Sequence, residues 1–516
     1  MRELYIGIDS GTQSTKALVV EGRHGKVVGT GHKAYGLIPG LPEGAKEQHP
    51  ETWRRAARAA VRSALKAARA TAGEVRAIGV SGQQHGFVPL DKQGRVIRPA
   101  KLWCDTSTTE ECEILTARLG DQRRVIARVG NAMLPGFTAP KILWLKRHEP
   151  HHYARLATVL LPHDYLNLWL TGRAVMECGD ASGTALLDVR RRVWSSQVLN
   201  AIDPELEGRL PELIASDELA GTLSESAAAD LGLPRQVAVS AGGGDNMMGA
   251  IGTGNTRPGV ITASLGTSGT IYACADRPVV DPAGEIAGFC DSTNRWLPLL
   301  CTMNVTVATE MVRRDFNLAH AAFERMARRA PAGSDGLLLL PYLEGERTPN
   351  VPSGTGVYFG VRPQTFTAAH FARAAMEGVT MGMNYGLRRL ASLGLKARQI
   401  RATGGGAQSR LWRQIMADIF GAEVVTLSVA EGAAYGAALQ AMWATRRARG
   451  ERASISDVTD AFVRVHRRQS ATPCAQNMRM YQELQSIQDS LSTALRPVFG
   501  RHRALRDGSA QARNSP

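Results

Sequence analysis

Apolar runs separated by short turns of small residues occur in one order that is repeated once along the chain. Residues 4–9 and 17–20 are two such runs, which predicts the strands of a β-hairpin. Residues 261–271 repeat this order, with Gly266 in the place of Gly11, 255 residues further along. Turns of glycine and hydroxyl residues present backbone N–H groups that suit a phosphate. The pattern therefore predicts a duplicated scaffold with two phosphate-binding hairpins that hold one polyphosphate.

The other apolar segments alternate between the period of a strand and the period of a helix. Strands are predicted at residues 25–33, 75–80, 237–240, 337–340 and 399–402. Helices are predicted at residues 50–71, 246–251, 368–390, 410–420, 432–444 and 475–495. This alternation is typical of layered α/β domains. The arginine-rich, polar end of the chain at 500–516 is predicted to be disordered.

The length of 516 residues exceeds what one hydrophobic core organises. We expect an N-terminal domain over 1–249, a second domain over 250–447, and a C-terminal extension over 448–516. Hydrophobic residues at 44% and charged residues at 21% are ordinary for a globular protein. The first strand begins close to Met1, and no apolar run reaches the length of a membrane span. We therefore expect a cytoplasmic protein.

Charge and cysteine content exclude two classes of function. The net charge of +15 is spread over helix faces, and aromatic residues make up only 6%, which disfavours a nucleic-acid binder. The seven cysteines are scattered and form no Cys-x-x-Cys pair, which disfavours a zinc site or a disulfide framework.

Two charged residues flank the first small-residue turn. Asp9 closes the first strand just before Gly11 and Thr12. A carboxylate in this place suits Mg²⁺, which prefers oxygen ligands; the alternative is an aspartate that only satisfies turn N–H groups. Lys16, in the second strand, is a candidate phosphate ligand or a solvated strand lysine.

Asp245 is the central candidate for catalysis. It follows three glycines at the end of a predicted strand and precedes Asn246 at the start of a short helix. The glycines allow a ligand to approach the backbone, and the helix N-terminus favours negative charge. The alternative is that Asp245 is only the N-cap of the helix.

Two further groups of polar residues have the composition of binding sites. Gln84, His85, Trp103 and Asp105 combine hydrogen-bonding groups with an apolar face, as a polyhydroxylated ligand requires. The glycine-rich turn at 403–407 could let an adenine or a ribose lie against the backbone. The alternative for this turn is an ordinary strand-to-helix connection.

The chain resembles a known family, the FGGY carbohydrate kinases. Residues 135–144 are similar to one family signature, and residues 356–361 with their continuation to 377 are similar to the second. The resemblance runs from residue 3 to about 445. It implies a two-domain α/β fold of the actin/hexokinase/Hsp70-like (ribonuclease H-like) ATPase superfamily, with a central cleft.

Within the family, residues 84–86, 102–105, 243–246 and 343–349 are similar to those of kinases of D-xylulose. The resemblance implies that Asp245 is the general base. It implies sugar contacts from Gln84, His85, Trp103, Asp105 and Asn246. It implies that the turns at Thr12 and at Gly266 and Thr267, and the glycines Gly405 and Gly406, hold ATP. The neighbouring residues Gly11, Gln13, Lys16 and Ser409 are further candidates for ATP contacts. Gln84 departs from the pattern, since many of these kinases have methionine there.

The expected reaction is therefore transfer of the γ-phosphoryl group of ATP·Mg²⁺ to the C5 hydroxyl of D-xylulose. Within the family the alternatives are ribulose, glycerol or gluconate; glycerol kinases typically carry Arg-Glu in place of Gln84-His85. A nucleotide-switched binding protein of the actin/Hsp70 type and a catalytically inactive sugar sensor are the alternatives outside catalysis. The expected partners are the ketose and ATP, with a homodimer as the candidate assembly and neither nucleic acid nor a membrane.

Overall fold

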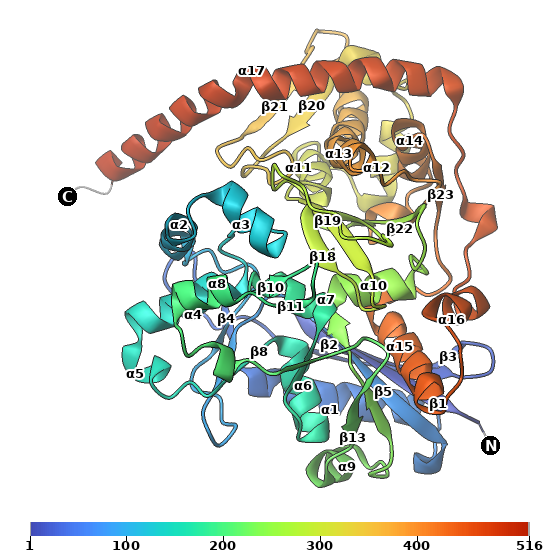
Figure 1. The fold of residues 1–516 in the computed structure, drawn as a ribbon. Helices are drawn as coiled ribbons and strands as arrows, with labels where there is room; N and C mark the ends of the chain where they lie inside the picture. The colour runs from blue at the N-terminus through green and yellow to red at the C-terminus, as the bar shows by residue number, and fades with distance from the viewer. Residues whose placement is uncertain (1, 514–516) are drawn as a thin grey trace. The chain divides into compact units, whose positions relative to one another are not determined.

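The computed structural model describes residues 2–513, whose helices and strands are drawn in Figure 1. The chain divides into two compact units, and neither is one continuous stretch. The first unit consists of residues 1–258, 274–298 and 431–464, and the second of residues 259–273, 299–430 and 465–516. The sequence was expected to form continuous domains, whereas residues 431–464 belong to the first unit although they follow most of the second.

The first unit is built on a sheet with the strand order β13-β14-β5-β1-β2-β3, in which β15 also pairs with β5. Its strands are β1 (Leu4–Ser10), β2 (Ser14–Glu21), β3 (Val27–Ala34), β5 (Val75–Gly82), β13 (Leu219–Thr222), β14 (Ala238–Ser240) and β15 (Gly243–Gly244). Strand β1 lies antiparallel to β2 and parallel to β5, and β15 is also parallel to β5. The predicted N-terminal hairpin is confirmed.

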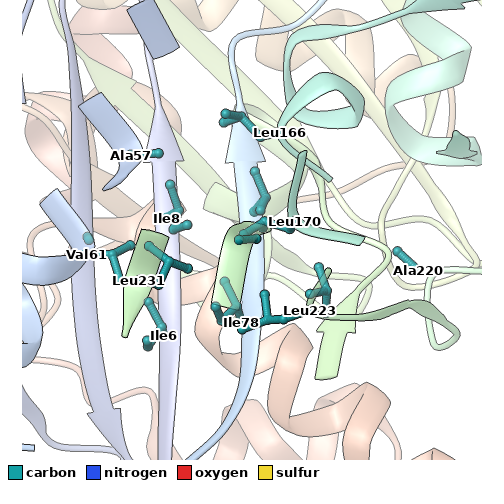
Figure 2. Packing of buried hydrophobic residues seen from close by; sticks show 14 of the residues in the cluster. Ile6, Ile8, Ala57, Val61, Ile78, Leu166, Leu170, Ala220, Leu223 and Leu231 are labelled. Carbon is teal, nitrogen blue, oxygen red and sulfur yellow. The ribbon is translucent and has the colours of Figure 1, made fainter. Parts of the chain in front are cut away.

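One face of this sheet carries the main hydrophobic core. Because successive side chains of a strand point to opposite faces, Ile6 and Ile8 of β1 and Ile78 of β5 share one face. They pack in one fully buried cluster with residues of the covering helices, as Figure 2 shows. These helices are α1 (Pro50–Ala67), α6 (Pro162–Thr171) and α9 (Glu225–Leu231).

The opposite face is covered by α15 (Gly432–Ala448), which approaches the sheet at glycines. A Cβ atom on Gly7 of β1 would lie 1.8 Å from the carbonyl oxygen of Ala434, and one on Gly79 of β5 would lie 2.0 Å from that of Ala437. The alternation that directs isoleucines to one face therefore directs glycines to the other. Helix α10 (Asp245–Gly252) packs on the same helix α15.

The second unit repeats the strand pattern of the first. Its main strands run in the order β19-β17-β16-β22-β23. They are β16 (Val260–Leu265), β17 (Gly269–Ala273), β19 (Trp296–Thr302), β22 (Gln399–Thr403) and β23 (Glu423–Val425). Strand β16 is antiparallel to β17 and parallel to β22, just as β1 is antiparallel to β2 and parallel to β5. The predicted duplication of the hairpin is confirmed.

The helices of the second unit include α11 (Thr306–Asp315), α12 (His320–Ala327), α13 (Ala368–Ser392), α14 (Arg410–Phe420) and α17 (Ala475–Arg513). Helix α17 corrects the prediction of disorder for residues 500–516, because it continues to Arg513. After Pro497 the segment contains mostly alanine, arginine, leucine and glutamine, which favour helix, and it extends a helix that is already formed. Residues 514–516 lie outside the described residues.

The cysteines and the apolar character of the helices were the subject of two expectations from composition. All seven cysteines are free thiols. Within residues 2–513, no helix has both the length and the apolar character that crossing a bilayer requires.

Candidate active site

The candidate residues of the first unit gather where three parallel strands end. Strand β1 pairs with β5 in a register that sets Asp9 opposite Ser81, and β15 pairs with β5 so that Gly243 also lies opposite Ser81. Ligand sites in open α/β sheets form at the carboxyl ends of such strands. Asp9, the Gln84 segment and Asp245 therefore leave the sheet at the same edge.

Asp9 is a half-buried carboxylate at the end of β1. Ser81 Oγ donates to its Oδ1 at 2.9 Å, and no other hydrogen-bond donor reaches this carboxylate among residues 2–513. Burial raises the pKa of Asp9 to about 6, although Ser81 and the charge of Lys16 act in the opposite direction. A carboxylate with a free oxygen at a strand end is a donor that fits Mg²⁺.

Asp245 is the first residue of α10, and its side chain does not cap the helix. The N-cap position is occupied by Gly244, which has no side chain that could cap the helix. The pKa of Asp245 is raised to about 7, first by burial and then by the negative charges of Asp9 and Asp180, which outweigh the hydrogen bonds from Asn246. A half-buried carboxylate with a near-neutral pKa can accept a proton at neutral pH.

A short hydrogen-bond chain holds the Asp245 carboxylate. Asn246 Nδ2 donates to Asp245 Oδ1 at 3.0 Å and to Gln84 Oε1 at 2.8 Å. Because Gln84 uses its oxygen for Asn246, its amide nitrogen is left as the donor. Gln84 is buried, and this Nε2 atom has no hydrogen-bond partner among the described residues.

His85 is held in a left-handed backbone conformation, with φ at 63°. This conformation is rare for a residue with a side chain, and it persists here because the carbonyl is fixed. The fully buried Lys141 donates from Nζ to His85 O at 2.8 Å and to Gly136 O at 2.6 Å. Burial lowers the pKa of Lys141 to about 7. The imidazole packs against both Phe137 and Phe289, with ring centroids at 4.8 and 5.6 Å.

The turn of the first hairpin is tied to the sugar-contact candidates. Trp103 Nε1 donates to Thr12 Oγ1 at 2.9 Å, and this hydroxyl donates to Gln83 Oε1 at 3.0 Å. Trp103 is 36% exposed, so part of the residue remains open to a ligand. Gly11 N donates to Ser14 O at 3.0 Å, which closes the turn.

Two candidates next to this turn have different surroundings. Gln13 is exposed and faces solvent. Lys16 Nζ lies 2.6 Å from Glu431 Oε2, and both side chains are more than a third exposed. The Lys16 ammonium thus has a carboxylate partner that a phosphate would have to replace or share.

Asp105 is fully buried, and of the other candidates for contact with a sugar only Gln84 is nearly so. Its Oδ2 accepts from Lys46 N at 2.9 Å and lies 3.3 Å from Lys101 Nζ. Its Oδ1 accepts from the backbone and the hydroxyl of Ser107 at 3.0 and 2.6 Å. Both oxygens are therefore engaged in holding the loop that carries Trp103.

The second unit carries the nucleotide candidates. Gly266 N donates to Ser268 O at 3.0 Å, and Gly266 O accepts from Thr306 N at the start of α11. Thr267 is exposed at the tip of this hairpin. In both turns a glycine N–H donates to a serine carbonyl oxygen, three residues later in the first turn and two residues later in the second, and each turn offers N–H groups and hydroxyls on its own unit.

The glycine-rich turn after β22 leaves an open backbone surface. Gly405 is exposed, and a Cβ atom there would meet nothing within 4 Å. Gly406 is buried against Leu265, where a Cβ atom would lie 2.9 Å from the Leu265 Cβ. Ser409 is the N-cap of α14, and its Oγ accepts from Trp412 N at 3.1 Å. A planar group could therefore lie against Gly405 with no side chain in the way.

Sequence reasoning missed three residues of this neighbourhood. Ser81 holds Asp9, Lys141 fixes His85, and Asp180 raises the pKa of Asp245. Ser81 is signalled by its place at the end of a strand, and Lys141 lies inside a segment that the resemblance singled out without a role. No local pattern marks Asp180, because tertiary packing alone brings it close to Gly244.

Comparison with known proteins agrees with this arrangement. Residues 4–252 match the model of the N-terminal domain of the FGGY family of carbohydrate kinases, and residues 261–445 match the model of its C-terminal domain. The chain belongs to the FGGY family of carbohydrate kinases, whose members use ATP. The predicted family and the predicted two-domain α/β fold class are confirmed.

Relatives and solved structures cover nearly the whole chain. Xylulose kinase of Haemophilus influenzae is 42% identical over 485 residues, which are 93% of this chain and 97% of that protein. Xylulose kinase of Escherichia coli K12 is 35% identical over 96% of this chain and 100% of its own. A crystal structure titled as a xyloylose kinase from Brucella ovis superposes with a TM-score of 0.88 at 31% identity, over 96% of this chain and 100% of that chain.

Proposed function

We propose that this protein transfers the γ-phosphoryl group of ATP to the C5 hydroxyl of D-xylulose, which forms D-xylulose 5-phosphate. The observation that carries the proposal is the Asp245 carboxylate, whose near-neutral pKa suits a general base and which lies beside Asn246 and Gln84. The similarity to xylulose kinases over most of the chain supports the choice of ketose.

Each candidate residue receives a role in this proposal. Asp245 accepts the proton of the C5 hydroxyl as that oxygen attacks the γ-phosphorus and the bond to ADP breaks. Gln84, His85 and Asn246 hold the sugar hydroxyls, and the exposed face of Trp103 covers its carbons. Asp105 acts by holding the Trp103 loop.

The nucleotide is assigned to small-residue turns and the adjoining glycines. Gly11, Thr12, Gln13 and Lys16 of the first hairpin, and Gly266 and Thr267 of the second, bind phosphate oxygens through N–H groups, hydroxyls and the ammonium. Gly405, Gly406 and Ser409 accommodate the adenosine. Asp9 holds Mg²⁺, directly or through water, and the ion neutralises phosphate charge when bound. A cytoplasmic location and a homodimer complete the proposal.

A panel of sugars tests the substrate. ADP release is measured with D-xylulose, D-ribulose, L-ribulose, glycerol and gluconate at equal concentrations, and the product position is read by ³¹P–¹³C NMR. We expect the highest kcat/KM for D-xylulose and a phosphate on C5. A higher kcat/KM for another member of the panel would refute the choice of ketose, and ADP release independent of any sugar would favour a nucleotide-switched binding protein.

A further inference from the structure

A buried ion cluster of the first unit lies next to the backbone of Gly244. His163, in the first turn of α6, is fully buried, with Nδ1 2.6 Å from Asp180 Oδ2 and Nε2 3.0 Å from Asp164 Oδ1. Burial alone would lower the pKa of His163, but the charges of the two carboxylates and the hydrogen bond with Asp180 raise it well above its usual value. The imidazole is thus held as a cation between two acids.

The second oxygen of Asp180 faces the residue before Asp245. A Cβ atom on Gly244 would lie 3.0 Å from Asp180 Oδ1 and 2.6 Å from Gln84 Cγ. Asp180 Oδ1 is buried and has no hydrogen-bond partner among the described residues, and the same holds for Gln84 Nε2. A buried acceptor and the buried side chain of Gln84 therefore lie against one glycine. Leaving both unpaired is costly, so a direct bond or one bridging water is favoured.

We propose that Asp180, held by His163, is a positioning residue for Asp245. Asp180 anchors the Gln84 amide, Gln84 fixes Asn246, and Asn246 orients the Asp245 carboxylate. Gly244 is required at this place because any side chain would separate Asp180 from Gln84. The inference rests on the proposed function, because it assigns Asp245 the role of base.

The charge of Asp180 provides a readout that a purely structural role would not have. Asp180 contributes to the raised pKa of Asp245, after burial and Asp9. The charged groups that act on Asp180 are His163, which pairs with it, and Asp164; Asp180 N also donates to Glu177 Oε2 at 3.3 Å. Lys16 and Glu431 act on Asp9. Loss of the Asp180 charge should therefore lower the pKa of Asp245 and move the acidic limb of kcat/KM to lower pH.

Asp164 supplies a matched control on the other side of the same imidazole. It is also fully buried, but its Oδ2 accepts from Leu161 N at 2.9 Å, at the start of α6. We compare Asp180→Asn and Asp164→Asn in the full chain, with kcat/KM for D-xylulose measured from pH 5.5 to 9. Asp180→Asn should move the acidic limb down by about half a pH unit or more and lower kcat by about tenfold. Asp164→Asn keeps the Asp180 carboxylate and should move the limb by less than Asp180→Asn does.

An unmoved limb in Asp180→Asn, or an equal movement in both variants, overturns the proposal. NMR of the ¹⁵N-histidine-labelled wild-type protein gives a second test, which does not depend on the folding of Asp180→Asn or Asp164→Asn. The signal of His163 is assigned by its loss in His163→Gln. We expect both ring nitrogens of His163 to be protonated from pH 6 to 8, and a neutral imidazole overturns the proposal. Absence of turnover with D-xylulose in the wild type would instead count against the proposed function.

Discussion

At the scale of single residues, the chemistry depends on one carboxylate. Asp245 combines partial burial with two negative neighbours, Asp9 and Asp180, which together bring its pKa to about 7. The Asp245→Asn variant keeps the shape and the hydrogen bond to Asn246 but cannot accept a proton. We expect turnover to fall on the order of 10²- to 10⁴-fold, with the ketose still bound in calorimetry.

The control for this variant is Asp230→Asn. Asp230 is an aspartate of the same unit that pairs with Arg54 and Arg58 and takes no part in the candidate site. Its turnover should equal that of the wild type. Near-normal turnover of Asp245→Asn would remove the general base from the proposed function.

The pH dependence of the wild type follows from the same carboxylate. Asp245 must be deprotonated to act as a base, and its pKa lies at about 7. We therefore expect kcat/KM to be level above pH 8 and to fall about tenfold per unit below pH 6.5. Initial rates at limiting D-xylulose with saturating ATP and Mg²⁺ measure this profile. A profile that stays level down to pH 5 would mean that Asp245 titrates in its usual range.

Residue type and local spacing predict some site residues and not others. Asp245 could be predicted because three glycines before a carboxylate form a local pattern. Asp105 was predicted as a sugar contact by its side-chain type, yet its carboxylate accepts four hydrogen bonds from three residues, which include the distant Lys46. Asp180 was not singled out, because its proximity to Gly244 arises only when residues 64 positions apart pack together. Burial and long-range contact are the properties that the local sequence does not contain.

At the scale of elements, the position of Asp245 depends on how α10 packs on α15. A Cβ atom on Gly436 would lie 1.8 Å from Met248 O, so the two backbones touch at this glycine. We expect Gly436→Ala to destabilise the protein by about 1–3 kcal/mol and to lower kcat, since α10 must shift and Asp245 is its first residue. Urea denaturation and steady-state kinetics measure the two effects.

Gly432, one turn earlier on α15, provides the comparison. A Cβ atom there would have its nearest neighbour, Thr253 Cγ2, at 3.8 Å, which is an ordinary contact. Gly432→Ala should therefore leave both stability and kcat close to those of the wild type. Equal effects of the two substitutions would show that loss of glycine as such, and not the helix contact, is responsible.

The elements were predicted more accurately inside than at their ends. The helix predicted at residues 410–420 coincides with α14, whose ends are marked by the Ser409 cap and by Gly421 in the left-handed region. The helix predicted at 50–71 ends earlier, as α1, at Ala67. For α17, composition indicated disorder near the end of the chain, whereas helix propensity and continuity extend the helix to Arg513. Clear capping residues thus decide where sequence-based bounds are reliable.

At the scale of the whole molecule, the internal repeat predicted the duplicated sheet but not the division of the chain. Gly11 and Gly266 each lie in the turn of a hairpin, and the first strand of each hairpin also pairs with a parallel strand. Helix α15 follows the second repeat in sequence but belongs to the first unit. Its small residues fit against Gly7 and Gly79, and this fit between distant segments has no signature in either segment alone.

One substitution in the second unit tests whether that unit binds the nucleotide. Gly405 is exposed, and a side chain there would meet no protein atom near its Cβ, so Gly405→Val should leave the thermal midpoint of the ligand-free protein unchanged. If adenosine lies against this backbone, the added side chain occupies its place. We expect the KM for ATP to rise about tenfold or more, with little change in the KM for D-xylulose. Gly73→Val, at a glycine of the first unit that is equally free of neighbours, should change neither constant. Separate binding surfaces for the two substrates require that this substitution weaken the binding of ATP and not that of D-xylulose. An unchanged KM for ATP in Gly405→Val would therefore mean that the nucleotide does not lie against this turn.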